Sequence, residues 1–247
     1  MRHAMAVGLV VLFAGVALGA DDKVKDARPG EKPEVKWRSL FDGKTLQGWK
    51  TTEFGAHGNP EVENGQIIVP AGDPLSGVTR EKDDVPHVNY EIELEAQRVN
   101  GNDFFLALTF PVRDAHASLI LGGWSGGVCG ISSIDGADAS ENPTSSYRKF
   151  ESGKWYKVRL RVTKDHLGAW LDGEQIVDQD LTDRRLSVRI EVSPSKPLGL
   201  ATYMTKAAYR NIRIRELAAD EAKPAPAADD GKGGKDPEDN RKGGREK

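Results

Sequence analysis

The stretch NYEIELEAQRV, residues 89–99, alternates strictly between apolar and polar side chains. Tyr90, Ile92, Leu94 and Ala96 fall on one side of an extended chain, and the positions between them carry glutamates and a glutamine. A period of two is typical of a β-strand with one buried and one solvated face. The segment therefore predicts a strand that contributes its apolar side to the core of a β-structure.

The solvated side of this strand carries Glu91, Glu93 and Glu95 in a row. Same-side residues of a strand lie about 6.6 Å apart. Like charges at that spacing raise one another's pKa, and the distance is close to the carboxyl separations used in glycoside hydrolysis. The alternative is a solvated face whose glutamates pair with the bases of a neighbouring strand. The segment 154–162 would supply such bases as Lys157, Arg159 and Arg161.

Short apolar or alternating runs follow along the chain, separated by Gly, Asn and Asp. Asp172-Gly173 predicts a type I′ hairpin between strands 167–171 and 174–178. About ten or more short strands with this turn chemistry predict an all-β fold, an antiparallel β-sandwich of the jelly-roll type. The only helix expected is a short turn near residues 206–208. Further strands are expected at 66–69, 104–110, 117–121, 126–134, 154–162, 187–193, 198–202 and 209–217.

Both ends of the chain differ in composition from its centre. Residues 1–20 combine a basic start, an apolar run and small residues near a cleavage point, which predicts a secretory signal peptide. Residues 21–35 are expected to be a linker, and the charged, Ala/Gly/Pro-rich residues 218–247 a disordered tail. The domain is then 36–217. The mature protein is expected to be exported to the periplasm, cell envelope or extracellular space, with no transmembrane span after signal cleavage.

Charge and cysteine content narrow the classes of partner and fold. The net charge is -3 with both signs interspersed, so the sequence gives no indication of nucleic-acid binding. The only cysteine, Cys129, cannot form an intramolecular disulfide, and its apolar surroundings predict a small buried residue rather than a nucleophile. An ordinary hydrophobic core is therefore expected to hold the fold.

Two segments that open and close the domain resemble a known family. They are WRSLFDGKTLQGW at 37–49 and YRNIRIREL at 209–217. Together they resemble the 3-keto-disaccharide hydrolase domain family, whose members are exported bacterial proteins with a concanavalin A-like jelly roll. The segment 63–68 and the hairpin at Asp172 also fit. Residues 102–110 replace the family's usual Asn-Ser-Gly segment that ends in arginine, so the chain resembles a divergent member.

The resemblance implies an exported carbohydrate-active protein, a glycoside hydrolase or lyase acting on 3-keto-disaccharides. A ketone at C3 acidifies the C2 proton, and the glycosidic oxygen on C1 can then leave by elimination. This route needs a base, an acid and a positive group for the enolate. Glu93 and Glu95 are the candidate base and acid, and Glu95 falls where the family carries an acidic residue. Arg148, in a polar loop, is the candidate positive group.

Candidate substrate-binding residues are aromatic and polar side chains outside the expected core. Trp124 and Trp170 offer rings on which a pyranose can stack, unless they only cover sheet edges. His57, with Glu53 on the same loop, is a further candidate base, and a solvated loop histidine is the alternative. Trp37 and Trp49 are expected to lie in the core. The remaining candidates are Gln97 on the acidic strand and Asn142 in the polar loop 132–143.

No metal site is assigned, because no ligand spacing is distinctive. A divalent cation such as Ca²⁺ stays open as a source of positive charge, with Glu93, Glu95, Asp135 or Asp138 as oxygen ligands. The expected partner is a carbohydrate or glycoconjugate. The alternatives to an enzyme are a non-catalytic, laminin-G-like glycan-binding module and a structural module joined by its tails to an envelope assembly. Glutamates that open into a pocket beside a tryptophan would favour catalysis, and glutamates occupied by neighbouring bases would favour binding or structure.

Overall fold

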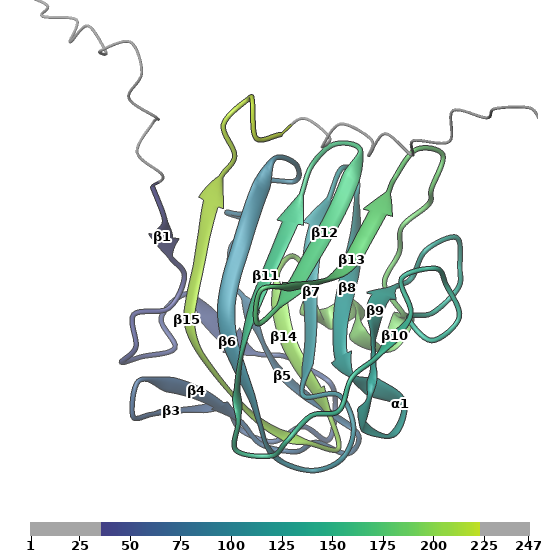
Figure 1. The fold of residues 1–247 in the computed structure, drawn as a ribbon. Helices are drawn as coiled ribbons and strands as arrows, with labels where there is room; N and C mark the ends of the chain where they lie inside the picture. Colours follow the sequence, from purple (N-terminus) through teal and green to yellow (C-terminus); the bar gives the residue numbers. More distant parts are fainter. Residues whose placement is uncertain (1–35, 223–247) are drawn as a thin grey trace, which may run out of the picture. The chain divides into compact units, whose positions relative to one another are not determined.

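A computed structural model describes residues 36–222, so the predicted signal peptide 1–20, the linker 21–35 and the tail from 223 onward lie outside the described residues. The described chain forms two antiparallel sheets that pack face to face (Figure 1). This confirms the predicted all-β sandwich. In the described part of the chain, no helix is long and apolar enough to cross a membrane.

Sheet A has eight strands in the order β13-β12-β11-β6-β15-β4-β3, and β1 pairs with β15 beside this path. Figure 1 shows β6 between β15 and β11. The strands are β1 (Arg38–Ser39), β3 (Glu61–Glu63), β4 (Gln66–Val69), β6 (Tyr90–Asn100), β11 (Trp155–Val162), β12 (His166–Leu171), β13 (Glu174–Asp180) and β15 (Lys206–Glu216).

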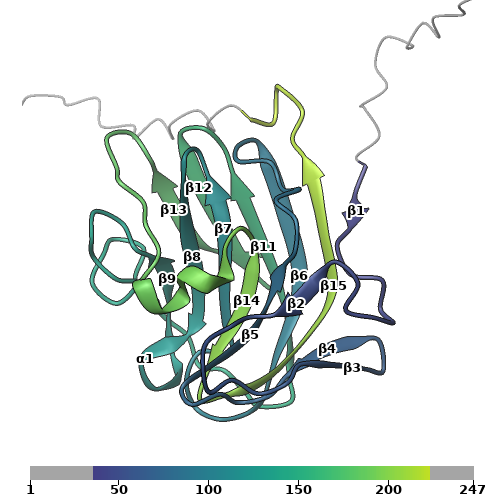
Figure 2. The same cartoon turned by 180° about the vertical axis from the view of Figure 1, so that it is seen from behind.

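Sheet B has seven strands in the order β10-β9-β8-β7-β14-β5-β2. Figure 2 shows it from behind, with a short 3-10 helix, η1 (Ile190–Ser195), crossing in front of it. A four-residue turn, α1 (Gly123–Gly126), joins β8 to β9, and its central residues Trp124 and Ser125 have left-handed φ angles of 48° and 67°. The strands are β2 (Trp49–Thr51), β5 (Leu75–Arg80), β7 (Leu106–Val112), β8 (Ala115–Gly122), β9 (Val128–Ser132), β10 (Ser146–Tyr147) and β14 (Gly199–Tyr203).

Strand β6 supplies its apolar side to the core between the sheets, as its alternation predicts. Tyr90, Ile92, Leu94 and Ala96 are all buried. The Tyr90 hydroxyl donates a hydrogen bond across the core to the carbonyl oxygen of Pro111 on β7, at 2.5 Å. This bond satisfies the one polar atom of the side chain and fixes sheet A against sheet B.

Two local predictions are wrong and one is confirmed. The predicted strand 187–193 is instead a loop that runs into η1, where Ile190 is 86% exposed. Pro194 lies inside η1. Because proline has no backbone N–H to donate to a neighbouring strand, it disfavours a central strand at this point. Residues 206–208, predicted as a helical turn, begin β15. The type I′ hairpin is confirmed, since Asp172 and Gly173 have φ angles of 50° and 90°.

The segment after β15 stays attached to sheet A over its first residues. Residues 218–222, which the sequence assigns to the tail, form a turn. Both carboxylate oxygens of Glu221 accept hydrogen bonds from Arg215, at 2.7 and 2.8 Å. The remainder of the predicted disordered tail lies outside the described residues.

Candidate functional site

The acidic strand β6 lies between two basic strands of sheet A. On one side, β11 places a base opposite each glutamate, which is the neighbour that the alternative interpretation required. On the other side, β15 supplies a second basic row that the sequence reasoning missed. The rows are Lys157, Arg159 and Arg161 on β11 and Arg210, Arg213 and Arg215 on β15.

Glu91 does not lie on a solvated face, and this expectation is wrong. Its side chain is only 2% exposed. One carboxylate oxygen accepts a hydrogen bond from Arg161 Nε at 2.7 Å, and the other lies 2.6 Å from Arg215 Nη2. Two guanidinium groups therefore enclose Glu91 and leave it no access to a substrate.

Glu93 and Glu95 are more exposed, and each pairs with an arginine of β15. Arg213 Nη2 lies 2.6 Å from Glu93, and Arg210 Nη2 lies 2.7 Å from Glu95. Partial burial acts to raise the pKa of Glu95, but hydrogen bonds from Asn211 and Arg210 hold that pKa below its ordinary value. A carboxylate stabilised in its charged form is a weak proton acceptor. The pairing therefore favours the structural interpretation of these glutamates.

A pocket of about 680 Å³ lies over the outer face of sheet A. It brings together Glu93, Glu95 and Trp170, the arrangement that the sequence analysis names as favouring catalysis. Trp37 also lines this pocket, so its predicted place in the core is wrong. The Trp37 ring lies instead against a guanidinium of β15. Trp49 is buried, and its predicted core position is confirmed.

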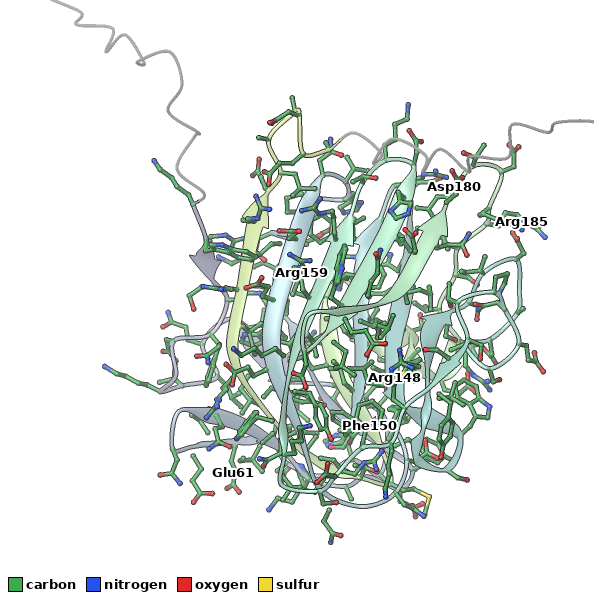
Figure 3. All side chains as sticks on the ribbon, in the orientation of Figure 1. Glu61, Arg148, Phe150, Arg159, Asp180 and Arg185 are labelled. Carbon is green, nitrogen blue, oxygen red and sulfur yellow. The ribbon has the colours of Figure 1, made fainter. Side chains whose placement is uncertain are left out.

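Three other candidates lie outside this pocket. Arg148 pairs with Glu174 at 2.5 Å, and Figure 3 shows Arg148 apart from Arg159 of the pocket. Gln97 donates to a loop carbonyl oxygen at 2.6 Å. Asn142 is 6% exposed, and its amide donates to three carbonyl oxygens while its own oxygen accepts from Thr144. Asn142 thus braces its loop, which contradicts its prediction as a substrate-binding residue.

The outer face of sheet B has a different character, because its central positions carry small side chains. Ala107, Thr109, Ser118 and Ala201 are all fully buried there. The register places them side by side on β7, β8 and β14. Small residues leave room above the sheet, and η1 lies over this face (Figure 2). These small side chains form the bottom of a hollow on sheet B, which we call the floor, and loops surround it.

A cleft of about 660 Å³ lies over this floor. Its walls include four aromatic side chains, Phe54, Phe104, Trp124 and Tyr203. The rings of Phe104 and Tyr203 pack with centroids 5.7 Å apart, and Trp124 is 42% exposed on α1. Trp124 and Trp170 therefore line separate pockets on opposite sheets. Sequence alone did not identify the other three aromatic walls.

A carboxylate lines the same cleft, and a histidine lies beside that carboxylate. Glu53, predicted as a substrate-binding residue, is part of its lining, and its carboxylate lies 3.6 Å from His57 Nε2. The Nδ1 atom of His57 lies 3.0 Å from the carbonyl oxygen of Gly58. The structure thus brings together Glu53 and His57, as their shared loop indicates. Among residues 36–222, His57 is the only basic side chain that pairs with Glu53.

An arginine-centred cluster completes the lining. Arg189 donates to Glu191 through Nε and Nη2, at 3.2 and 2.7 Å, and to Asp138 through Nη1. The hydrogen bonds from Arg189 hold the pKa of Glu191 below its ordinary value. The sequence does not point to Arg189 and Glu191, because the alternation of residues 187–193 predicts a strand and not a loop beside a cleft. The nearby Pro194 was the signal against that strand.

The oxygen ligands considered for a divalent cation do not form a site in the described part of the chain. No group of three or more His, Cys, Asp or Glu side chains suited to a metal ion occurs in the described part of the chain. Asp135 pairs with Arg184 and Asp138 with Arg189, whereas Glu93 and Glu95 lie on the other sheet. The four candidate oxygen ligands are therefore not brought together.

Cys129 is buried in the core, as predicted. Burial raises the pKa of its thiol to about 11. A thiol with so high a pKa carries almost no thiolate at neutral pH, so Cys129 is not a nucleophile in the folded protein.

Comparison with known proteins identifies a family whose model matches most of the described chain. A family model described as a 3-keto-alpha-glucoside-1,2-lyase-like domain matches residues 36–215. None of the curated proteins compared with the chain matches it. Similar solved structures include the Crh5 transglycosylase in complex with NAG, with 12% identity, a TM-score of 0.50 and 74% of this chain aligned to 84% of that one.

Two further structures are similar at about the same level. The carbohydrate-binding module CBM66 from Bacillus subtilis has 16% identity and a TM-score of 0.48, over 68% of this chain and 96% of that one. SCLam, a non-specific endo-beta-1,3(4)-glucanase from family GH16, has 12% identity and a TM-score of 0.48, over 76% and 95%. Likeness at these identities concerns the fold.

Proposed function

The chain belongs to the 3-keto-alpha-glucoside-1,2-lyase-like domain family, and from this premise we propose that it cleaves 3-keto-glycosides in the cleft over sheet B. The observation that carries the proposal is that one cleft combines aromatic walls with the Glu53 carboxylate and the Arg189 guanidinium, and that the His57 imidazole lies 3.6 Å from that carboxylate. Sugar sites typically combine apolar walls with a few convergent polar groups. Membership of the family makes a carbohydrate the expected ligand class.

The proposed reaction is an elimination. A base removes the C2 proton, which the C3 ketone acidifies, and the electron pair forms the C1–C2 double bond as the C1–O bond breaks. In an α-glucoside the C2–H and C1–O bonds are trans-diaxial, so the base and the acid approach opposite faces of the ring. Two different groups are therefore needed, together with a positive charge near the C3 oxygen.

His57 is the proposed base, and Glu53 its positioning partner. With the proton on Nδ1 donated to the Gly58 carbonyl oxygen, the Nε2 lone pair is left to accept a proton. The Glu53 carboxylate, 3.6 Å away, would stabilise the imidazolium that forms. Imidazole is the commonest general base in enzymes.

Arg189 and Tyr203 supply the two remaining roles in this proposal. Arg189 lines the cleft and donates three of its N–H groups to Asp138 and Glu191, which fix its position. Its two remaining N–H groups would donate to the enolate oxygen. Tyr203 lines the cleft, and its hydroxyl has no hydrogen-bond partner among the described residues, so it can serve as the acid for the leaving oxygen.

Turnover of a chromogenic 3-keto-α-glucoside tests the proposal and distinguishes the two pockets. His57→Gln is expected to lower kcat by about 100-fold or more, the usual contribution of a positioned general base. Glu95→Gln, which changes a carboxylate of sheet A, is the matched control and is expected to stay close to wild type. If Glu95→Gln loses activity while His57→Gln stays active, the proposal is wrong and the catalytic residues are Glu93 and Glu95 on sheet A.

The second candidate function is glycan binding without catalysis. The observation in its favour is that every glutamate of β6 on sheet A is occupied by an arginine of β15. Under this alternative the chain would bind a neutral or keto-glycoside without turning it over. Retained binding of the keto-glycoside, measured by calorimetry, with no product from the wild type would select this alternative.

We further propose that the protein acts outside the cytoplasm, since residues 1–20 read as a secretory signal. Expression of the full chain in a bacterium that exports proteins, followed by mass determination of the fractionated product, tests this. The expected product lacks about 20 N-terminal residues and is found outside the cytoplasm. A full-length product in the cytoplasm would contradict the proposal.

A further inference from the structure

The outer face of sheet A carries three stacks of an arginine on a tryptophan. A guanidinium stacked on an indole ring keeps its N–H edge free for hydrogen bonds, and the edge matches a planar carboxylate. The stacks are Arg213 on Trp37, Arg210 on Trp155 and Arg159 on Trp170, with guanidinium-to-ring distances of 4.5, 4.1 and 4.1 Å.

Two of the three stacks bind a carboxylate of the protein itself. Arg213 donates to Glu93 through Nε and Nη2, at 3.0 and 2.6 Å. Arg210 donates to Glu95 through Nε, at 2.8 Å. On this face, an arginine stacked on tryptophan is thus repeatedly used as a carboxylate receptor.

The third stack has no carboxylate. Among residues 36–222, Arg159 makes no side-chain hydrogen bond and no ion pair, although Glu93 is its partner in the strand register. Glu93 is bound to Arg213 on the opposite side. Arg159 lines the pocket of about 680 Å³, as does Trp170. Figure 3 shows Arg159 on the outer face of the sheet.

Two cationic side chains of this pocket form no ion pair in the described part of the chain. Lys157 also lines it and has no ion pair in the part of the chain that the structure describes. The two glutamates of the pocket are neutralised by the arginines of β15. Asp172, the acidic residue that faces Lys157 on the hairpin, accepts the backbone N–H of Lys157 at 2.8 Å. Lys157 and Arg159 are therefore the cationic side chains of this pocket that no described carboxylate pairs with, and Lys157 also lies close enough to Glu95 to help lower its pKa.

We propose that Arg159, Trp170 and Lys157 form a second carbohydrate site, which binds a uronate residue of an acidic oligosaccharide. The guanidinium edge would take the carboxylate, as its two neighbours on the sheet take Glu93 and Glu95. The indole rings of Trp170 and Trp37 provide apolar surface for the pyranose ring, which a receptor for a bare anion would not need. This site lies on the sheet opposite the cleft proposed for catalysis and does not depend on that proposal.

Calorimetric titration of the full chain with trigalacturonate tests the site. Binding is expected to weaken as salt is added, because the contact is between charges, and maltotriose is expected not to compete. Arg159→Gln is expected to weaken binding by about tenfold or more. Arg159→Lys is expected to weaken it by less, because lysine keeps the positive charge but lacks the two parallel N–H groups with which a guanidinium binds a carboxylate. Arg184→Gln is the matched control, since Arg184 is a surface arginine that pairs with Asp135 away from the pocket.

Thermal unfolding of each variant separates loss of the site from loss of the fold. Arg159 has no carboxylate partner among the described residues, so Arg159→Gln is expected to keep the wild-type Tm. Equal binding of trigalacturonate and maltotriose, or equal affinities of wild type and Arg159→Gln, would overturn the proposal. Tighter, Arg159-dependent binding of an oligoglutamate peptide than of trigalacturonate would also overturn it, in favour of a protein partner.

Discussion

Glu91 and Arg215 form an ion pair that is almost completely shielded from solvent. Their side chains are 2% and 8% exposed, and Oε2 and Nη2 lie 2.6 Å apart. Arg161 binds the other oxygen of Glu91, and Glu221 binds the other side of Arg215. Buried charges are tolerated where, as in this case, each has its partners in place. The network joins β6, β11, β15 and the segment that follows β15.

Glu91→Gln is expected to lower the free energy of unfolding by about 3–5 kcal/mol, because it leaves two guanidinium groups without their shared anion. Urea unfolding followed by tryptophan fluorescence measures this. Glu93→Gln is the matched control, and it is expected to cost about 1 kcal/mol or less, since its pair with Arg213 is 28% and 48% exposed. Equal losses in the two variants would contradict the importance of burial.

Glu221 is expected to make stability depend on pH in the acid range. Hydrogen bonds from Arg215 lower the pKa of Glu221 from 4.5 to about 2. Because the folded state has the lower pKa, the stabilisation is fully present above pH 4.5 and is lost as the pH falls toward 2. Glu221→Gln should therefore flatten the Tm-against-pH curve between these values. An unchanged curve in the variant would show that Glu221 contributes nothing there.

Trp124→Ala is expected to weaken substrate binding at the cleft over sheet B. The exposed ring is one of the aromatic walls, and loss of an aromatic contact costs about 1 kcal/mol, or roughly a fivefold rise in KM for a 3-keto-glucoside. Tyr147→Ala is the control, because Tyr147 is 71% exposed and does not line the cleft. A rise in KM of the same size in both variants would remove Trp124 from the site.

Much of the fold follows from local patterns in the sequence. The alternation of 89–99 gives both the strand and its buried side, and Asp172-Gly173 gives the hairpin that joins β12 to β13. These features depend on neighbours within a few residues. The burial of Glu91 does not, since it needs Arg215, which lies 124 residues away along the chain. No local pattern shows which strand will pair with β6.

The candidate site was harder to predict, because both pockets are assembled from distant segments. Trp170, Glu93 and Glu95 line one pocket, which is one of the two arrangements that the sequence leaves open. No pattern near the glutamates indicates the arginines of β15 that pair with them. The cleft over sheet B depends on a floor of small residues and on η1, whose segment was assigned to a strand. Proline at 194 was the one local sign of the difference.

Gly168→Ala offers a test of the stack between Trp170 and Arg159. Gly168 and Trp170 are two residues apart on β12 and so share a face. A Cβ atom at Gly168 would lie 2.5 Å from Cη2 of Trp170, too close for any real contact, so the indole must move. We expect a folded protein with altered tryptophan fluorescence and roughly threefold or more weaker trigalacturonate binding, as one cation–π contact is lost. In a Trp170→Phe background, where the outer ring is absent, Gly168→Ala should cost less stability; an equal cost in both backgrounds would show that the clash lies elsewhere.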